Sequence, residues 1–209
     1  RVLFRSNKNL PSVAEFVQQT KEHVLNGWYT KASSVTHLVI GNEAGDADSI
    51  ISAIGLAYVE TLRAVEENND RDKLIVPIVS IPAKHLENLR PETMYLLSAC
   101  AGIDSNDLIS IDQSNLLPQK VTVTLVDHNY HQSSNEWVVT DIVDHHLDEK
   151  KHMNTCPPSN RNIAFEESRA LVASTNTLVA EIFFSMPTAT MPPSLAILLL
   201  GVILLDSVN

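Results

Sequence analysis

The chain alternates between short runs of apolar residues and longer segments in which apolar residues recur at helical spacing. Near-continuous apolar runs are typical of strands buried in a parallel sheet, and they cover residues 35–40, 74–81, 108–111, 121–126 and 137–143. Helical spacing predicts helices over residues 12–28, 49–67, 91–100, 169–185 and 193–205. Strands that alternate with helices predict an α/β fold with a doubly wound, mainly parallel five-stranded sheet flanked by helices.

The composition is that of a globular protein with an excess of acidic residues. The chain has 209 residues, 44% of them hydrophobic, and is long enough to bury a core without disulfide or zinc staples. Fifteen Lys and Arg against 25 Asp and Glu leave a formal net charge of -10. This balance disfavours a nucleic acid polymer as partner, because such binding rests on cationic contacts to phosphate. For a phosphate-rich substrate, another group must supply positive charge.

Cysteine usage and the apolar runs predict a soluble protein of a reducing compartment. Cys100 and Cys156 are too few for a disulfide framework or a cysteine-based zinc site. The longest apolar run, Leu195 to Leu205, is about half of the ~20 residues that a membrane span needs. We therefore expect a cytoplasmic location, no membrane partner and a buried helix over this run.

The two ends of the chain differ from the rest. Residues 1–6 are interpreted as a non-native scar, translated from a sequencing adapter. Residues 7–34 then form an N-terminal helical segment, and residues 35–209 form the main domain. Residues 206–209 follow an apolar helix with no polar tail, which predicts that the chain is truncated there.

Acidic and histidine residues follow three of the predicted strands. The first strand is followed by Asp46 and Asp48, and later strands end in Asp127-His128-Asn129 and in Asp144-His145-His146. A further acid, Asp206, closes the last apolar helix. Ligands of open α/β sheets bind beyond the carboxyl ends of the strands, so we expect these groups to converge.

A convergent group of carboxylates requires compensating charge. Two carboxylates ~4 Å apart repel by roughly 4 kcal/mol at an effective dielectric constant of 20. Divalent cations remove this repulsion without large pKa shifts. Carboxylates with one imidazole suit Mn²⁺ or Mg²⁺, with Co²⁺ or Zn²⁺ as further candidates. Two such ions would clamp the attacking and leaving oxygens in phosphoryl transfer and supply the positive charge that the side chains lack.

Each residue also has a purely structural interpretation. Asp48 alone is better explained as a helix N-cap. His128 and His131 are compatible with ordinary loop histidines, and Asp206 with a surface acid at a helix terminus. The helix dipole disfavours negative charge at a C-terminus, however, which favours a cation near Asp206. The joint placement at strand ends supports the site.

The motifs at these positions resemble the DHH phosphoesterase family, and most closely its branch of cytosolic exopolyphosphatases and Prune-like proteins. The resemblance extends from about residue 36 to the end of the chain. It rests on five segments in the family's order: GNEAGDADS at 41–49, LVDH at 125–128, IVDHH at 142–146, VASTNTLV at 172–179 and LLDSVN at 204–209.

The resemblance implies a role for each matching residue. One cation would be held by Asp46 and Asp127, and the second by Asp48, Asp127, His145 and Asp206. A hydroxide between the two cations would attack the terminal phosphorus. His146 would face the substrate phosphate, with Asp144 as an orienting group. Ser174 and Thr177 would stand at the start of a helix. There they would contact phosphate or, by the safer interpretation, cap the helix.

Two departures from the family pattern qualify these roles. Many members carry histidine four residues before the first aspartate of the Asp-x-Asp pair, where this chain has Asn42. An amide oxygen is a poorer ligand for a transition metal than imidazole, so the first cation should be looser or more like Mg²⁺. Asn42 is therefore a catalytic candidate that separates this chain from pyrophosphatases. Members also carry a smaller C-terminal domain that clamps the phosphate chain, and this domain is expected to be absent here.

The function implied by the resemblance is metal-dependent release of terminal phosphate from inorganic polyphosphate. The alternatives are a Prune-like cyclic-nucleotide phosphodiesterase and a weakly active scaffold or binding protein, and an inorganic pyrophosphatase is less favoured. Prune-like animal proteins often have arginine at the last position of the Asp-His-His triplet, whereas this chain has His146, which favours an enzyme. The expected partner is a small anionic phosphate compound, and the oligomeric state is left open.

Overall fold

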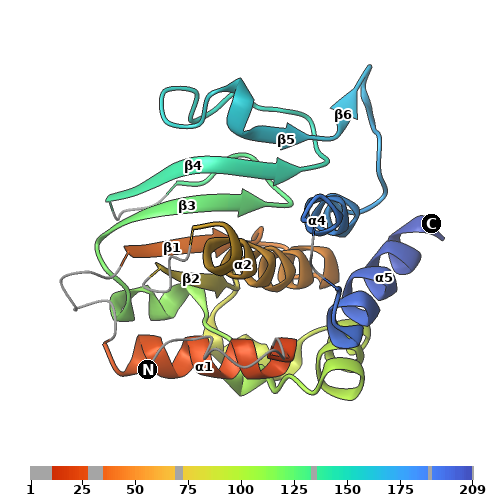
Figure 1. Cartoon of the computed structure of the whole chain (residues 1–209). Helices are drawn as coiled ribbons and strands as arrows, with labels where there is room; N and C mark the ends of the chain where they lie inside the picture. The colour runs from red at the N-terminus through yellow and green to blue at the C-terminus, as the bar shows by residue number, and fades with distance from the viewer. Residues whose placement is uncertain (1–10, 28–34, 69–72, 133–135, 188–189, 209) are drawn as a thin grey trace.

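The computed structural model describes residues 11–27, 35–68, 73–132, 136–187 and 190–208. Its centre is a five-stranded sheet in the order β2-β1-β3-β4-β5, in which every neighbouring pair is parallel (Figure 1). The strands are β1 (Val35–Ile40), β2 (Lys73–Ile78), β3 (Lys120–Val126), β4 (Glu136–Asp144) and β5 (Arg161–Ile163). The predicted α/β fold with a parallel five-stranded sheet is confirmed.

Helices cover the sheet and continue beyond its carboxyl edge. The longer ones are α1 (Val13–Leu25), α2 (Ala47–Asn68), α4 (Thr175–Phe184) and α5 (Pro193–Ser207). The short α3 (Pro91–Met94) continues into a π-helical turn over Tyr95–Cys100. The described elements also include 3₁₀ helices of three to six residues and a small hairpin, β6 (Phe165–Glu166) with β7 (Arg169–Ala170).

The fifth strand is not the one that the apolar pattern indicates. Residues 108–111 form no strand, because only Ser110 makes an isolated bridge, to Val79, before a 3₁₀ helix begins at Ile111. Leu108 and Ile109 are nevertheless buried, so their apolar character reflects core packing rather than sheet pairing. The fifth strand is β5 at the opposite edge, where Arg161 and Asn162 hide the apolar signal of a short edge strand.

Helix boundaries follow the capping residues. Ser12 and Glu15 form the predicted capping box of α1, which ends at Leu25 rather than at residue 28; residue 28 lies outside the described residues, as does the predicted scar at 1–6. The helix predicted from residue 169 begins only at Thr175, because Ser174 caps it and residues 169–170 form β7.

The core lies on both faces of the sheet. On one face, Val39 and Ile75 pack against α2, which in turn packs on α4 and α5 (Figure 1). On the other face, Leu38 and Ile40 pack with residues of the connecting segments. The apolar run 195–205 belongs to α5, but the prediction of a buried helix holds for one face only. The helix buries Leu195, Leu198, Leu199 and Val202 and leaves Ile197, Leu200, Leu204 and Leu205 exposed. No helix in the described ranges is long and apolar enough to cross a bilayer.

A histidine is buried within the sheet. The ring nitrogens of His37 on β1 lie 2.7 and 2.9 Å from the hydroxyls of Thr122 and Thr124 on β3. Burial, with a smaller effect from Lys73, lowers the pKa of His37 to about 4. The ring is therefore neutral in the fold at pH 7.

We expect acid to unfold the protein partly through His37. A base whose pKa falls on folding stabilises the fold above its ordinary pKa of 6.5, and this contribution is lost as the pH falls through about 4. At pH 4 the loss amounts to about 3 kcal/mol. His37→Gln keeps a polar side chain that does not titrate. Urea unfolding measures the free energy of unfolding of both proteins at pH 7 and pH 4. Its decrease between the two pH values should be smaller in the variant than in the wild type by this amount. An equal loss in both proteins would contradict the prediction.

Candidate metal centre

The candidate site lies at the carboxyl ends of β1, β3 and β4, where parallel strands bring distant residues to one edge of the sheet. A cavity of about 370 Å³ opens there. The predicted metal ligands all line it, together with two other candidates: Asp46, Asp48, Asp127, His145, Asp206, Asn42 and His146. Residues separated by up to 164 positions along the chain therefore share one cavity.

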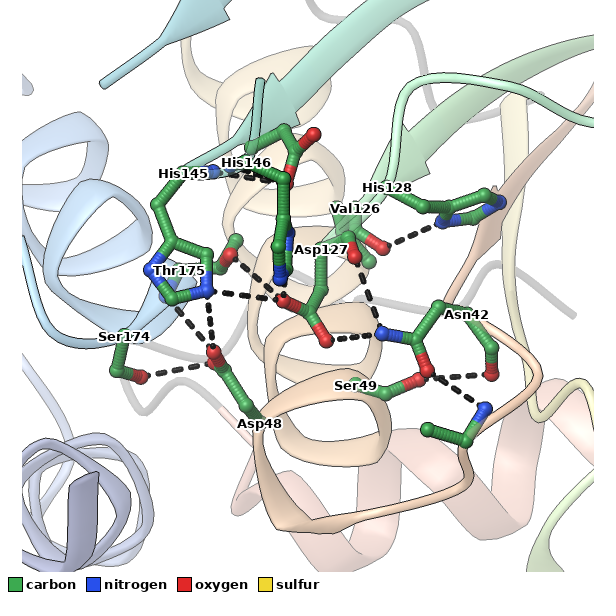
Figure 2. A network of polar contacts seen from close by, with 12 residues as sticks. Asn42, Asp48, Ser49, Val126, Asp127, His128, His145, His146, Ser174 and Thr175 are labelled. Carbon is green, nitrogen blue, oxygen red and sulfur yellow. Dashed lines mark hydrogen bonds and ion pairs between the residues drawn. The ribbon is translucent and has the colours of Figure 1, made fainter. Parts of the chain in front are cut away.

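The turn from β1 into α2 places the first two aspartates. A Cβ atom at Gly41 would lie 2.4 Å from Oγ of Ser49, so glycine allows the strand to approach the helix closely. The Ser49 amide donates to Oδ1 of Asp46 at 3.0 Å. Asp46, and not Asp48, therefore caps α2, and the capping interpretation of Asp48 is wrong. This leaves the buried Asp48 carboxylate directed at α4 and His145 (Figure 2).

Asp127 lies at the centre of the polar network (Figure 2). Its φ of 63° is in the left-handed region, which aspartate tolerates better than most residues. Its side chain is 3% exposed, and its carboxylate oxygens accept from Nδ2 of Asn42 at 2.5 Å and from Oγ1 of Thr175 at 3.3 Å. Burial, reinforced by the charges of Asp48 and Asp46 and opposed by a hydrogen bond with His145, raises the pKa of Asp127 to about 7.

His145 faces two of the aspartates. Its Nδ1 donates to the Val172 carbonyl at 3.1 Å, which directs Nε2 into the cavity. Nε2 lies 3.3 Å from Oδ1 of Asp127 and 3.4 Å from Oδ2 of Asp48. Burial alone would lower the pKa of His145, but the hydrogen bond with Asp127 and the nearby carboxylates raise it to about 9.

Asp144 holds the neighbouring histidine in place. It is fully buried, and its Oδ1 accepts from Nδ1 of His146 at 2.8 Å and from the backbone amide of His145 at the same distance. Asn129 donates to its other oxygen at 2.6 Å. Burial alone would raise the pKa of Asp144, but these hydrogen bonds outweigh it and lower the pKa. The His146 side chain, 56% exposed, is thus oriented at the mouth of the cavity.

Asp206 reaches the cavity from the last turn of α5. Burial and then the charge of Asp48 raise its pKa to about 6. Its Oδ2 is buried and has no hydrogen-bond partner among the residues that the structure describes. A buried acceptor without a partner is costly, and a cation in the cavity would satisfy it.

The donor set fits a divalent cation. Ligand atoms of Asp127, His145 and His146 lie within 4.8 Å of one another, and this compact group includes His146, which the resemblance assigns to the substrate. The other donors in the cavity are carboxylates, the ligands preferred by Mn²⁺ and Mg²⁺. The site lacks compensating positive charge. This is indicated by the raised pKa values of Asp127 and Asp206 and by the unpartnered oxygen of Asp206.

Several polar residues near the site have structural roles. His128 contacts the Val126 carbonyl at 2.9 Å and His131 stacks on Trp137, and neither lines the cavity, in keeping with ordinary loop histidines. Ser174 is the N-cap of α4, which confirms the capping interpretation for this residue, whereas Thr177 is the third residue of the helix and not its cap. A phosphate contact by Ser174 or Thr177 stays a prediction.

Sequence reasoning missed three residues that hold the site together. Thr175 and Asn176 contact Asp127 and Asp48, and Asn129 contacts Asp144. Thr175 and Asn176 lie inside the segment 172–179 that carries the resemblance, so their place in a motif was the available signal. Asn129 directly follows the Asp127-His128 pair but belongs to none of the five segments.

Asn42 supports Asp127 rather than offering its oxygen to the cavity. Its amide nitrogen donates to both the carbonyl and the carboxylate of Asp127, while its oxygen accepts from the Ala44 amide at 2.8 Å. We expect Asn42→His to tighten Mn²⁺ binding about tenfold, because imidazole is the better ligand for a transition metal. Asn42→Ala should instead weaken it. Calorimetric Mn²⁺ titration measures both, and unchanged affinity in the two variants would show that residue 42 does not influence the site.

The chain is similar in sequence to known proteins. The chain is 33% identical over 183 residues to "Exopolyphosphatase PRUNE1" of Rattus norvegicus and 33% identical over 180 residues to that of Homo sapiens. Each match covers 83% of this chain and 36% of the relative, so the chain spans about a third of the relatives' length. A solved exopolyphosphatase-related protein from Bacteroides fragilis aligns with a TM-score of 0.42 and 16% identity, over 81% of this chain and 44% of that chain. The model of the DHH family, N-terminal domain, matches residues 36–202, and the chain belongs to this family.

Proposed function

We propose that the protein is a metal-dependent hydrolase that releases terminal phosphate from inorganic polyphosphate. The observation that carries this proposal is the single cavity in which four carboxylates and two histidines meet. Membership of the DHH family and the exopolyphosphatase names of the relatives support the substrate class. The chain spans 36% of the length of those relatives, so their activity is assigned to this chain only as a proposal.

The residues of the cavity divide into cation ligands and supporting groups. Asp46, Asp48, Asp127, His145 and Asp206 would hold two divalent cations, Mn²⁺ or Mg²⁺, with Asp127 contributing to both. When bound, the cations would supply positive charge that attracts phosphate oxygens and favours loss of a proton from the attacking water. Asn42 and Thr175 keep the Asp127 carboxylate in place through their hydrogen bonds.

His146 is the group best placed to meet the substrate. Its ring is half exposed at the cavity, and its Nδ1 donates a hydrogen bond to Asp144. This bond raises the pKa of His146, so the ring carries positive charge at neutral pH more readily than a free histidine. His146 would therefore bind the substrate phosphate, with Asp144 fixing its orientation.

The charge of the cavity favours a small phosphate compound over a polymer of nucleotides. Among the described residues that line the cavity there is no lysine or arginine. Cations bound in the cavity would then provide the attraction for phosphate, and the chain's net charge of -10 disfavours a long nucleic acid.

Both cysteines are free, which supports a reducing, cytoplasmic location.

Phosphate release from a panel of substrates tests the proposal. Tripolyphosphate, pyrophosphate and a cyclic nucleotide are compared with Mn²⁺ or Mg²⁺ present and with EDTA added. We expect metal-dependent release from tripolyphosphate to be the fastest. Faster hydrolysis of the cyclic nucleotide would favour the phosphodiesterase alternative, and release from none of them would favour a scaffold.

A further inference from the structure

The Asp48 carboxylate is held by the first turn of a different helix, α4. Its Oδ1 accepts from Oγ of Ser174 at 2.8 Å, from Nδ2 of Asn176 at 2.8 Å and from the Asn176 amide at 3.3 Å. Its Oδ2 accepts from the Thr175 amide at 3.1 Å. Ser174, Thr175 and Asn176 are each 0% exposed, so these bonds form away from solvent (Figure 2 shows Ser174 and Thr175).

This arrangement divides the two oxygens of Asp48 between two tasks. Three donors occupy Oδ1, which leaves it little capacity for another partner. Oδ2 has one backbone donor and lies 3.4 Å from Nε2 of His145. Oδ2 is thus the oxygen directed toward the other cavity residues.

The contacts of Asp48 explain why an amide side chain stands at position 176. The three hydrogen-bond partners of its amide nitrogen are all acceptors: Oδ1 of Asp48, the Asp48 carbonyl at 3.4 Å and Oγ of Ser174 at 3.4 Å. The orientation of the amide is therefore determined by its neighbours. Its own oxygen is buried and has no hydrogen-bond partner in the described part of the chain.

A buried amide with an unpartnered oxygen is unfavourable as a packing group. An apolar side chain of similar volume would avoid that penalty but would remove the donor that Asp48 faces. The residue at 176 therefore serves the carboxylate rather than the core. The position at the start of α4 adds to this effect, because helix N-termini stabilise nearby negative charge.

We propose that Asn176 is a positioning residue that orients Asp48 for cation binding. It acts through the Asp48 carboxylate and does not itself reach the cavity lining. The inference rests on the proposed metal-dependent function. It predicts that loss of the Asn176 donor weakens cation binding without emptying the site of ligands.

The test measures Mn²⁺ affinity of Asn176→Leu by calorimetry on the protein freed of metal. Groups that orient a ligand typically contribute about 10- to 100-fold in metal affinity, and we expect a loss in this range. Thr93→Val is the matched control, because Thr93 is also fully buried in a helix and its hydroxyl is also unpartnered. It should leave the affinity unchanged. If Asn176→Leu does not fold, Asn176→Ala carries the same prediction, because it also removes the donor and has a smaller side chain.

A double-mutant cycle separates positioning from a general loss of structure. In an Asp48→Asn background the carboxylate is already gone, so Asn176→Leu should produce little further loss of Mn²⁺ affinity. Full loss in both backgrounds, or unchanged affinity in the single variant, would overturn the inference while leaving the proposed function intact. A wild-type protein that binds neither Mn²⁺ nor Mg²⁺ would overturn both.

Discussion

Asp127→Ala is expected to abolish metal-dependent phosphate release. Asp127 faces Asn42, Thr175 and His145 at the centre of the site, and no other described carboxylate contacts all three. Groups that merely orient a metal ligand contribute about 10- to 100-fold, so removal of a central ligand should reduce activity by more than about 100-fold. Phosphate release from tripolyphosphate with Mn²⁺ measures the effect.

The backbone at Asp127 requires a companion variant. Its φ of 63° lies in the left-handed region, where alanine is disfavoured by roughly 1–2 kcal/mol. Asp127→Asn tolerates that conformation and removes only the charge, so it separates loss of the ligand from backbone strain. Asp141→Ala, an aspartate of β4 that does not line the cavity, is the control and should remain active. Activity that survives Asp127→Asn would remove this residue from the cation site.

Divalent cations are expected to raise the melting temperature substantially. A ligand that binds only the folded state at 100 times its dissociation constant stabilises it by about 2.7 kcal/mol. For a chain of this size, 1 kcal/mol corresponds to about 2–4 °C, so saturating Mn²⁺ should raise Tm by about 5–11 °C. The raised pKa values of Asp127 and Asp206 point the same way, because a cation relieves the burial of their charge.

Differential scanning calorimetry with Mn²⁺, Mg²⁺ and EDTA measures the shift. EDTA should reverse it, and Asp127→Asn should abolish most of it. The same increase in Asp127→Asn as in the wild type would assign the stabilisation to cations bound elsewhere on this acidic chain.

The sheet was largely predictable because buried parallel strands are rich in apolar residues. Val, Leu and Ile mark β1 and β3 within a residue or two, although His37 interrupts β1 and two threonines interrupt β3. β5 escaped detection because a three-residue edge strand contains Arg161 and Asn162. Residues 108–111 show the converse error, since an apolar run also arises where a loop packs into the core.

The candidate site was predictable to the extent that its residues follow strands. Asp127 and the Asp144-His145-His146 triplet stand directly at strand ends, so the rule for open sheets places them at one edge. The donors that orient them were not predictable in this way. Asn176 contacts Asp48 across 128 positions, and nothing in local periodicity encodes that distance.

The amino-acid sequence alone determined the α/β class, the family and the set of acidic and histidine residues, because these depend on local pattern and on motifs. The tertiary structure decided which aspartate caps α2, which oxygen of Asp48 faces the cavity and which groups hold the Asp127 carboxylate. The cap is a local contact that the sequence left open, whereas the contacts of Asp48 and Asp127 join residues 48 to 126 positions apart, which no local pattern encodes.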